Sequence, residues 1–105
     1  MVRGAKVKFR VTLLDAAGLP LSELLVNDMQ LSLYTTTARE SIACSIAVGS
    51  GITKESQGVY TIEIPETDTV KLENWGVAML EGWLLPVRRK IAFNLGPVKD
   101  NIKNV

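Results

Sequence analysis

The sequence predicts an all-β fold: a sandwich of about seven antiparallel strands packed in two layers. Apolar and polar residues alternate with a period of two in segment after segment, as in half-buried strands. Turn signals separate these segments about every 8 to 12 residues, and no amphipathic helix pattern lies between them. The clearest segment is 59–64, whose alternation places on one face Tyr60, Ile62 and Ile64.

The residues around this segment predict its boundaries. The turn 49–51, Gly-Ser-Gly, precedes it, because glycine adopts positive φ without steric cost. The polar stretch 54–58 is predicted as a second turn. Pro65 ends the strand, because proline has no N–H to donate to a neighbouring strand.

The stretch 67–72, Thr-Asp-Thr-Val-Lys-Leu, predicts one short helical turn. Thr67 or Asp68 is positioned to cap its N-terminus. Val70 and Leu72 are then available to close one end of the β core.

Other segments show the same strand pattern, and Pro20 restricts the shortest of them to a sheet edge. The segment 77–84 is apolar on both faces apart from Glu81, which is typical of a central strand covered twice. We therefore expect one domain over 1–96, followed by a tail over 97–105 that is frayed or reaches a partner. The remaining predicted strands are 6–14, 19–21, 29–34, 42–48 and 88–95.

Composition narrows the classes of function. The 105 residues are 47% hydrophobic, enough for a core, and carry a net charge of +1 that gives no overall attraction to nucleic acid or acidic membrane. The sequence has one cysteine, no signal-peptide pattern and no apolar run of the ~18 residues that a membrane helix needs. We expect a protein made in the cytoplasm, with no membrane partner.

The residues needed for most catalytic and metal sites are missing. Without histidine, Ser–His–Asp and Cys–His arrangements cannot form, and zinc or copper sites lose their usual ligands. Cys44 lies in an alternating apolar row, where a free cysteine is typically a small buried hydrophobe. Paired carboxylates are the remaining acid–base option, and the candidates are Glu63, Glu66, Asp68 and Glu73. A glycosidase-like pair and a calcium site are the alternatives for them, although their spacing matches no calcium-loop motif. These acids flank a polar turn, where solvated charge is ordinary, and this interpretation is favoured. The sequence therefore predicts no catalytic residue, no metal and no cofactor.

Two basic stripes are candidate partner-binding residues. If the first and last strands are neighbours, five cations share one surface suited to an anionic partner. The other interpretation is a solvated face that discourages edge-to-edge pairing, and the balanced net charge favours it. Nucleic acid is therefore not expected as a partner. The cations are Lys6, Lys8 and Arg10 on the first strand, and Arg88 and Lys90 on the last.

Aromatic residues are the second group of binding candidates. Trp75 follows a polar turn and precedes a glycine, so we expect it to be exposed, and tryptophan is common in interface anchors and sugar platforms. Tyr34 is predicted on the outward face of the segment 29–34, together with Gln30 and Ser32, whereas the predicted inward residues are Met29, Leu31 and Leu33. Trp83 is expected in the core or at the rim of the sandwich.

The order of these signals resembles the small immunoglobulin-like domains at the N-terminus of phage upper-baseplate and tail-fibre proteins. The residues that carry the resemblance are DAAGLPL at 15–21, GSGIT at 49–53, GVYTIEI at 58–64 and TDTVKL at 67–72. The resemblance implies an immunoglobulin-like β-sandwich with a structural role in a virion. Such a protein is cytoplasmic before assembly. Family members usually continue into a larger fibre, whereas this sequence ends at Val105. A stand-alone accessory protein and a prophage remnant are therefore both open as interpretations.

Asp-x-x-Gly-x-Pro-Leu at 15–21 also resembles the opening of transthyretin-like modules, which rank second for the fold. For function, we expect a non-enzymatic domain that binds protein partners or its own copy through an edge strand or Trp75. The alternative is a carbohydrate-binding module that uses Trp75 and the nearby acidic residues.

Overall fold

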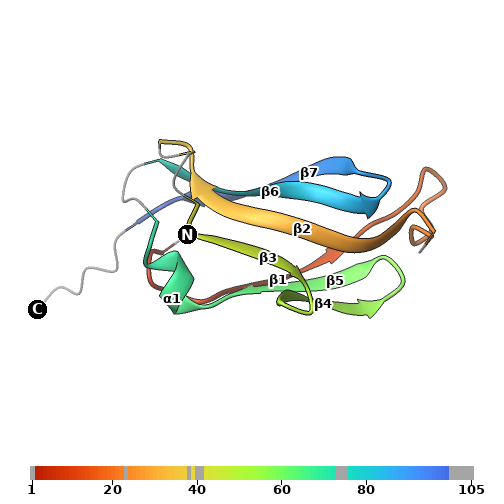
Figure 1. Ribbon diagram of the computed structural model, residues 1–105, viewed down its shortest axis with the longest axis horizontal. Helices are drawn as coiled ribbons and strands as arrows, with labels where there is room; N and C mark the ends of the chain where they lie inside the picture. Colours follow the sequence, from red (N-terminus) through yellow and green to blue (C-terminus); the bar gives the residue numbers. More distant parts are fainter. Residues whose placement is uncertain (1, 23, 38, 40–41, 73–75, 100–105) are drawn as a thin grey trace, which may run out of the picture.

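The computed structural model describes residues 2–22, 24–37, 39, 42–72 and 76–99 (Figure 1). In these ranges the chain forms seven strands and one short helix. The elements are β1 (Val7–Thr12), β2 (Val26–Thr35), β3 (Cys44–Val48), β4 (Gly51–Ser56), β5 (Val59–Ile64), α1 (Glu66–Thr69), β6 (Val77–Pro86) and β7 (Arg89–Pro97).

The seven strands belong to one sheet with the order β1-β5-β4-β3-β2-β6-β7. Figure 1 shows this sheet curled, so that β2, β6 and β7 lie opposite β1, β4 and β5. The prediction of an all-β fold is confirmed. The prediction of antiparallel strands only is wrong, because β3 and β4 pair in parallel. The two layers are therefore parts of one mixed, half-barrel sheet.

The parallel pair arises at the predicted glycine turn. Gly49 and Gly51 have φ of +91° and +95°, a backbone conformation that residues other than glycine rarely adopt. The N–H of Ala47 donates to the carbonyl of Ser50 at 3.0 Å, which holds the turn closed. The turn therefore takes the chain from β3 in one layer to β4 in the other.

Six of the predicted segments correspond to strands, and one does not. The segment 19–21 contributes only an isolated bridge between Leu14 and Pro20. The predicted turn 54–58 is a turn only at 57–58, because its first three residues, 54–56, belong to β4 (Gly51–Ser56). Ile52 is the one buried residue of β4, so its polar sequence lacks the alternation on which strand prediction depends.

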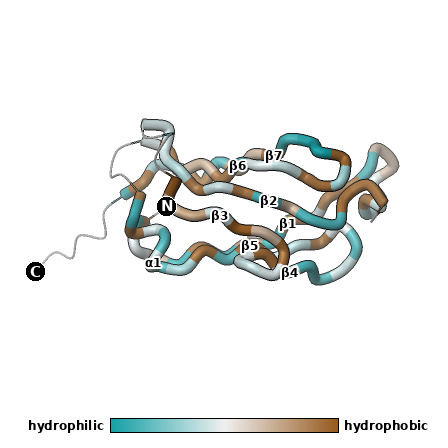
Figure 2. Tube along the Cα trace, in the orientation of Figure 1, coloured by the Kyte–Doolittle hydropathy of each residue, from teal (hydrophilic) through white to brown (hydrophobic). Residues whose placement is uncertain are grey.

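The core lies between the two layers of the curled sheet. Figure 2 shows apolar and polar residues alternating along the strands, as predicted. The inward residues of 29–34 and 59–64 are buried as expected. The buried apolar residues are Val26, Met29, Leu31, Leu33, Tyr34, Ile46, Ile52, Tyr60, Ile62, Ile64, Leu72, Ala78, Leu80, Leu84 and Val98.

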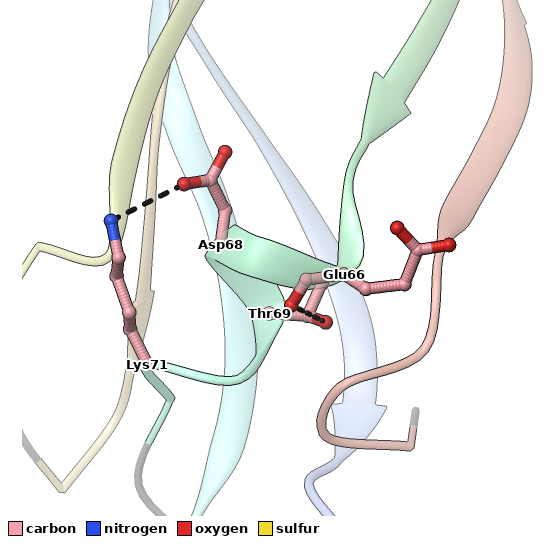
Figure 3. A network of polar contacts seen from close by, with 4 residues as sticks. All are labelled: Glu66, Asp68, Thr69 and Lys71. Carbon is pink, nitrogen blue, oxygen red and sulfur yellow. Dashed lines mark hydrogen bonds and ion pairs between the residues drawn. The ribbon is translucent and has the colours of Figure 1, made fainter.

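The helix α1 begins at Glu66, one residue before the predicted stretch 67–72. Pro65 occupies the N-cap position, and no side chain caps the helix. The prediction that Thr67 or Asp68 caps it is therefore wrong. Asp68 instead forms an ion pair with Lys71, with 3.4 Å between carboxylate oxygen and Nζ (Figure 3).

The helix closes one end of the core through its last turn. Leu72 is buried, as expected, whereas Val70 is 50% exposed, so the prediction that it fills the core is wrong. Thr69 is buried, and its hydroxyl donates to the carbonyl of Ala5 at 2.9 Å. This hydrogen bond fastens the helix to the segment that precedes β1.

The chain remains part of the domain beyond the predicted boundary at 96. Val98 packs in the core, and its N–H donates to the carbonyl of Gly76 at 3.0 Å. Lys99 forms a parallel bridge with Val2. The expectation of a tail beginning at 97 is therefore wrong for 97–99, and 100–105 lie outside the described residues. No helix in the described part of the chain is long and apolar enough to span a membrane.

Candidate functional site

The two basic stripes do not form one surface. The first and last strands, β1 and β7, are the two edges of the sheet and are not hydrogen-bonded to each other. Their inner faces meet through the rings of Phe9 and Phe93. Successive side chains of a strand point to opposite faces of the sheet. Lys8 and Arg10 are the neighbours of Phe9, so they point outward from β1. By the same alternation, Lys90 points away from the face of β7 that carries Phe93, so the cations lie on the outer faces of opposite layers.

The first basic stripe, formed by Lys6 just before β1 and by Lys8 and Arg10 on β1, is partly neutralised by an acidic residue of β5. Lys6 Nζ lies 2.6 Å from an Oε atom of Glu63. The hydrogen bond to Glu63 and the attraction of its charge raise the pKa of Lys6. The same hydrogen bond and charge lower the pKa of Glu63, with a smaller contribution from Lys8. These contacts favour the interpretation of a solvated face.

The outer face of β2, β3, β6 and β7 carries two aromatic residues beneath cations. Trp83 is 42% exposed, on the outer face of β6 rather than in the core. Arg88, in the β6–β7 turn, places its guanidinium carbon 5.5 Å from the centroid of the Trp83 ring. Tyr34 is only 6% exposed, and the guanidinium carbon of Arg39 lies 5.4 Å from its ring centroid.

A hollow of about 520 Å³ lies on this face. We call it the outer-face hollow. Two rows of side chains cross it, because the strand register aligns Ser45, Ser32 and Glu81 in one row. The next row contains Ala47, Gln30, Trp83 and Lys90. The two serines are short, whereas Gln30 and Trp83 in the next row are long, so the side chains of this face differ in height there.

The polar groups of the hollow include both donors and acceptors. The hydroxyls of Ser32 and Ser45 lie 3.3 Å apart and share a hydrogen bond. Gln30 offers an amide, Glu81 a carboxylate and Arg39 a guanidinium beside the exposed indole. An apolar ring surface bordered by convergent polar groups is the usual composition of a small-molecule site.

The Tyr34 hydroxyl is buried with no hydrogen-bond partner among the described residues. An unpaired buried hydroxyl costs about 1 to 3 kcal/mol, so such groups are rare in folded proteins. Tyr34 also lines the outer-face hollow. The structure thus contains an unused hydrogen-bonding group beside the polar side chains of that hollow.

The acidic residues that the sequence singled out lie elsewhere. Glu63 and Asp68 line a separate hollow of about 500 Å³ beside the glycine turn, and each is paired with a lysine. Figure 3 shows Glu66 and Asp68 on α1. Trp75 and Glu73 lie outside the described residues. Within the described ranges, no group of three His, Cys, Asp or Glu side chains could hold a metal ion.

Cys44 is half-buried and packs against the core from β3. Burial raises the pKa of its thiol, and the charge of Asp68 adds to this effect while Lys71 opposes it. The placement agrees with the interpretation of Cys44 as a small hydrophobic residue.

The loop between β1 and β2 and the turn between β6 and β7 lie at the end of the molecule opposite α1 (Figure 1). They carry exposed large apolar side chains. Backbone hydrogen bonds join the segments that carry them: the N–H of Leu21 donates to Leu13, and the N–H of Val87 donates to Leu25. An adjoining hollow of about 430 Å³ is lined mainly by apolar residues and bordered by Arg88 and Arg89. We call this surface the apolar end; its exposed members are Leu14, Leu19, Leu24, Leu25 and Val87.

Sequence reasoning missed most members of the outer-face hollow. Ser32 and Gln30 were recognised as outward residues, but nothing local indicated that Ser45, Glu81 and Arg39 would join them. The one available signal was Glu81, a charge that interrupts an otherwise apolar strand. Comparison of the chain with protein-family models, curated protein sequences and solved structures found no match.

Proposed function

We propose that this chain is a non-enzymatic protein-interaction domain that docks into a larger assembly through its apolar end. The observation that carries the proposal is the exposure of five large apolar side chains on neighbouring loops, with Leu24 86% exposed. Contiguous apolar surface is costly in water and commonly marks an interaction site. The apolar end thus takes the docking role that Trp75 or an edge strand has in the sequence-based hypothesis.

The loops of the apolar end are held in place by specific contacts. The N–H of Leu13 donates to the carbonyl of Gly58 at 2.7 Å, and the side-chain amide of Gln57 donates to the carbonyl of Pro20 at 3.3 Å. A Cβ atom at Gly58 would lie 2.8 Å from the carbonyl oxygen of Leu13, so the loops approach as closely as glycine allows. A surface held in this way loses little conformational freedom on binding.

The finer part of the proposal is an immunoglobulin-like domain of a phage or prophage tail, made in the cytoplasm and carried into the virion. The order of turn motifs along the chain supports it, as does a curled sheet with two facing layers. The parallel β3–β4 pair departs from the pattern of two separate antiparallel sheets. Tail or portal genes on either side of the coding sequence would support this context, and genes of an unrelated operon would contradict it.

Docking is tested with the chain itself as the probe, because an exposed apolar surface also associates with a second copy at high concentration. Sedimentation velocity should show concentration-dependent self-association of the wild type. Leu24→Lys should remain monomeric, because a charge on the most exposed leucine opposes its burial.

Val70→Lys is the matched control, since Val70 is an exposed aliphatic residue at the opposite end of the molecule. We expect this variant to associate like the wild type. A wild-type chain that stays monomeric up to about 1 mM would contradict the proposal. Equal association of all three proteins would contradict the assignment of the surface.

A further inference from the structure

We propose that the outer-face hollow binds a carbohydrate, with Trp83 as the platform on which a pyranose ring stacks. This site is distinct from the apolar end, and the inference does not depend on the docking proposal. It differs from the sequence-based alternative, which used Trp75 and the acids near α1. The hollow instead combines one exposed indole with polar residues from β2, β3, β6 and β7.

The exposed indole is the first requirement of such a site. One face of a sugar ring is lined by C–H groups, which pack against the flat apolar surface of an aromatic ring. Trp83 remains 42% exposed although Arg88 lies over its ring, so the indole offers free surface to a ligand. The backbone of Trp83 is paired on both sides, with Gln30 and with Lys90, so the strand that carries it is ordered before a ligand binds.

The polar groups match the hydroxyls of a sugar. Each sugar hydroxyl both donates and accepts, so it needs donors and acceptors side by side. Ser32 and Ser45 supply hydroxyls, Gln30 an amide, Glu81 an acceptor and Arg39 a donor. Charges of both signs line the hollow, negative at Glu81 and positive at Arg39 and Lys90, so anionic probes are the direct comparison with a neutral sugar. The polar character of the hollow disfavours an apolar peptide.

The unpaired Tyr34 hydroxyl is an independent indication of a ligand. Tyr34 lines the hollow with its hydroxyl buried and unpartnered among the described residues. Arg39 also lines the hollow, and its guanidinium lies over the Tyr34 ring. A ligand hydroxyl that reached the Tyr34 hydroxyl would supply the missing hydrogen bond.

The spacing of the site is set by the close approach of β2 and β6. Gln30 pairs with Trp83, and Leu31 pairs with Gly82 in the adjacent position. A Cβ atom at Gly82 would lie 1.7 Å from the carbonyl oxygen of Gln30, so only glycine permits this approach. The amide of Gln30 and the indole of Trp83 are therefore held side by side before any ligand arrives.

Isothermal titration calorimetry with cellohexaose, chitohexaose and maltohexaose tests the proposal on the full chain, with inorganic phosphate and heparin as anionic probes. We expect at least one neutral hexasaccharide to bind the wild type. Trp83→Ala should weaken that binding at least about tenfold, and Trp83→Phe should restore part of it by keeping a ring. Leu24→Ala, at the apolar end, is the control and should bind like the wild type.

Glu81→Gln and Gln30→Ala provide a second test that leaves the indole in place. We expect each to weaken binding of the same hexasaccharide, and circular dichroism checks that each variant is folded. Absence of binding to all three hexasaccharides would overturn the proposal. So would binding that Trp83→Ala leaves unchanged, or binding of phosphate or heparin alone. Because Leu24 variants test docking and Trp83 variants test sugar binding, the two proposals can fail separately.

Discussion

Phe9 and Phe93 meet edge to face, with ring centroids 5.6 Å apart and an interplanar angle of 65°. They lie on β1 and β7, the two strands furthest apart in the sheet order. Edge-to-face packing is a favourable geometry for aromatic rings. This contact therefore joins the two edges of the curled sheet across the core.

Phe93→Ala should destabilise the fold by about 2 to 4 kcal/mol, below the cost at a fully buried site because Phe93 is half-buried. Chemical unfolding monitored by circular dichroism measures this free energy. Ala92→Ser, on the exposed face of the same strand, is the control and should change stability by less than about 0.5 kcal/mol. A similar effect of both substitutions would show that the ring contact does not stabilise the curled sheet.

Gly82→Ala should destabilise the protein by more than about 4 kcal/mol or prevent folding, because the new methyl group would displace the backbone of β2. Gly49→Ala is the matched control. Gly49 has open space around its Cβ position and only an unfavourable φ, so we expect a cost of about 1 kcal/mol there. Thermal melting of both variants checks the difference, and a mild effect at Gly82 would contradict the close approach.

The Lys6–Glu63 pair predicts a dependence of stability on pH. The pKa of Glu63 is lowered in the folded chain, so its contribution is present above the ordinary pKa and is lost as pH falls through the lowered value. The pKa of Lys6 is raised, so its contribution is present below the ordinary pKa and is lost as pH rises through the raised value.

Glu63→Gln should therefore lose less stability than the wild type between neutral pH and about pH 3. Urea unfolding at a series of pH values measures the difference. Both side chains are exposed, so about 1 M salt should reduce the difference by screening. Identical pH profiles of the two proteins at low salt would show that the pair does not act in solution.

Cys44 should react slowly in the folded protein, because burial raises the pKa of its thiol and lowers the thiolate fraction. We expect a chromogenic disulfide reagent to react with the native chain at least about tenfold more slowly than with the urea-unfolded chain. The chain has one cysteine, so the signal reports this site alone. Equal rates in the two states would contradict the half-buried placement.

Alternation predicted most strands because it is a local consequence of one buried face. Segment 59–64 matches β5 residue for residue, and the inward residues Met29, Leu31 and Leu33 are buried as expected. β4 escaped prediction because Ile52 is its one buried residue. The turn Gln57-Gly58, between β4 and β5, was the signal that could have indicated a hairpin there.

Binding residues were less predictable, because a surface is assembled from strands distant in the sequence. Lys8 and Lys90 could be assigned to outward faces, but only the curl of the sheet places them on opposite layers. Tyr34 was correctly placed on an outward face. It is nevertheless buried, and no local pattern indicates either this burial or the position of Arg39 over its ring.

The sequence by itself determined that this chain is all-β and where six of its strands run. It also determined which side chains of those strands point inward, because side-chain alternation follows from the local pleat of a strand. The tertiary structure decided that β3 and β4 pair in parallel, that Phe9 meets Phe93, and that polar side chains from β2, β3 and β6 surround Trp83. These features depend on the order and register of strands, which are set by long-range pairing.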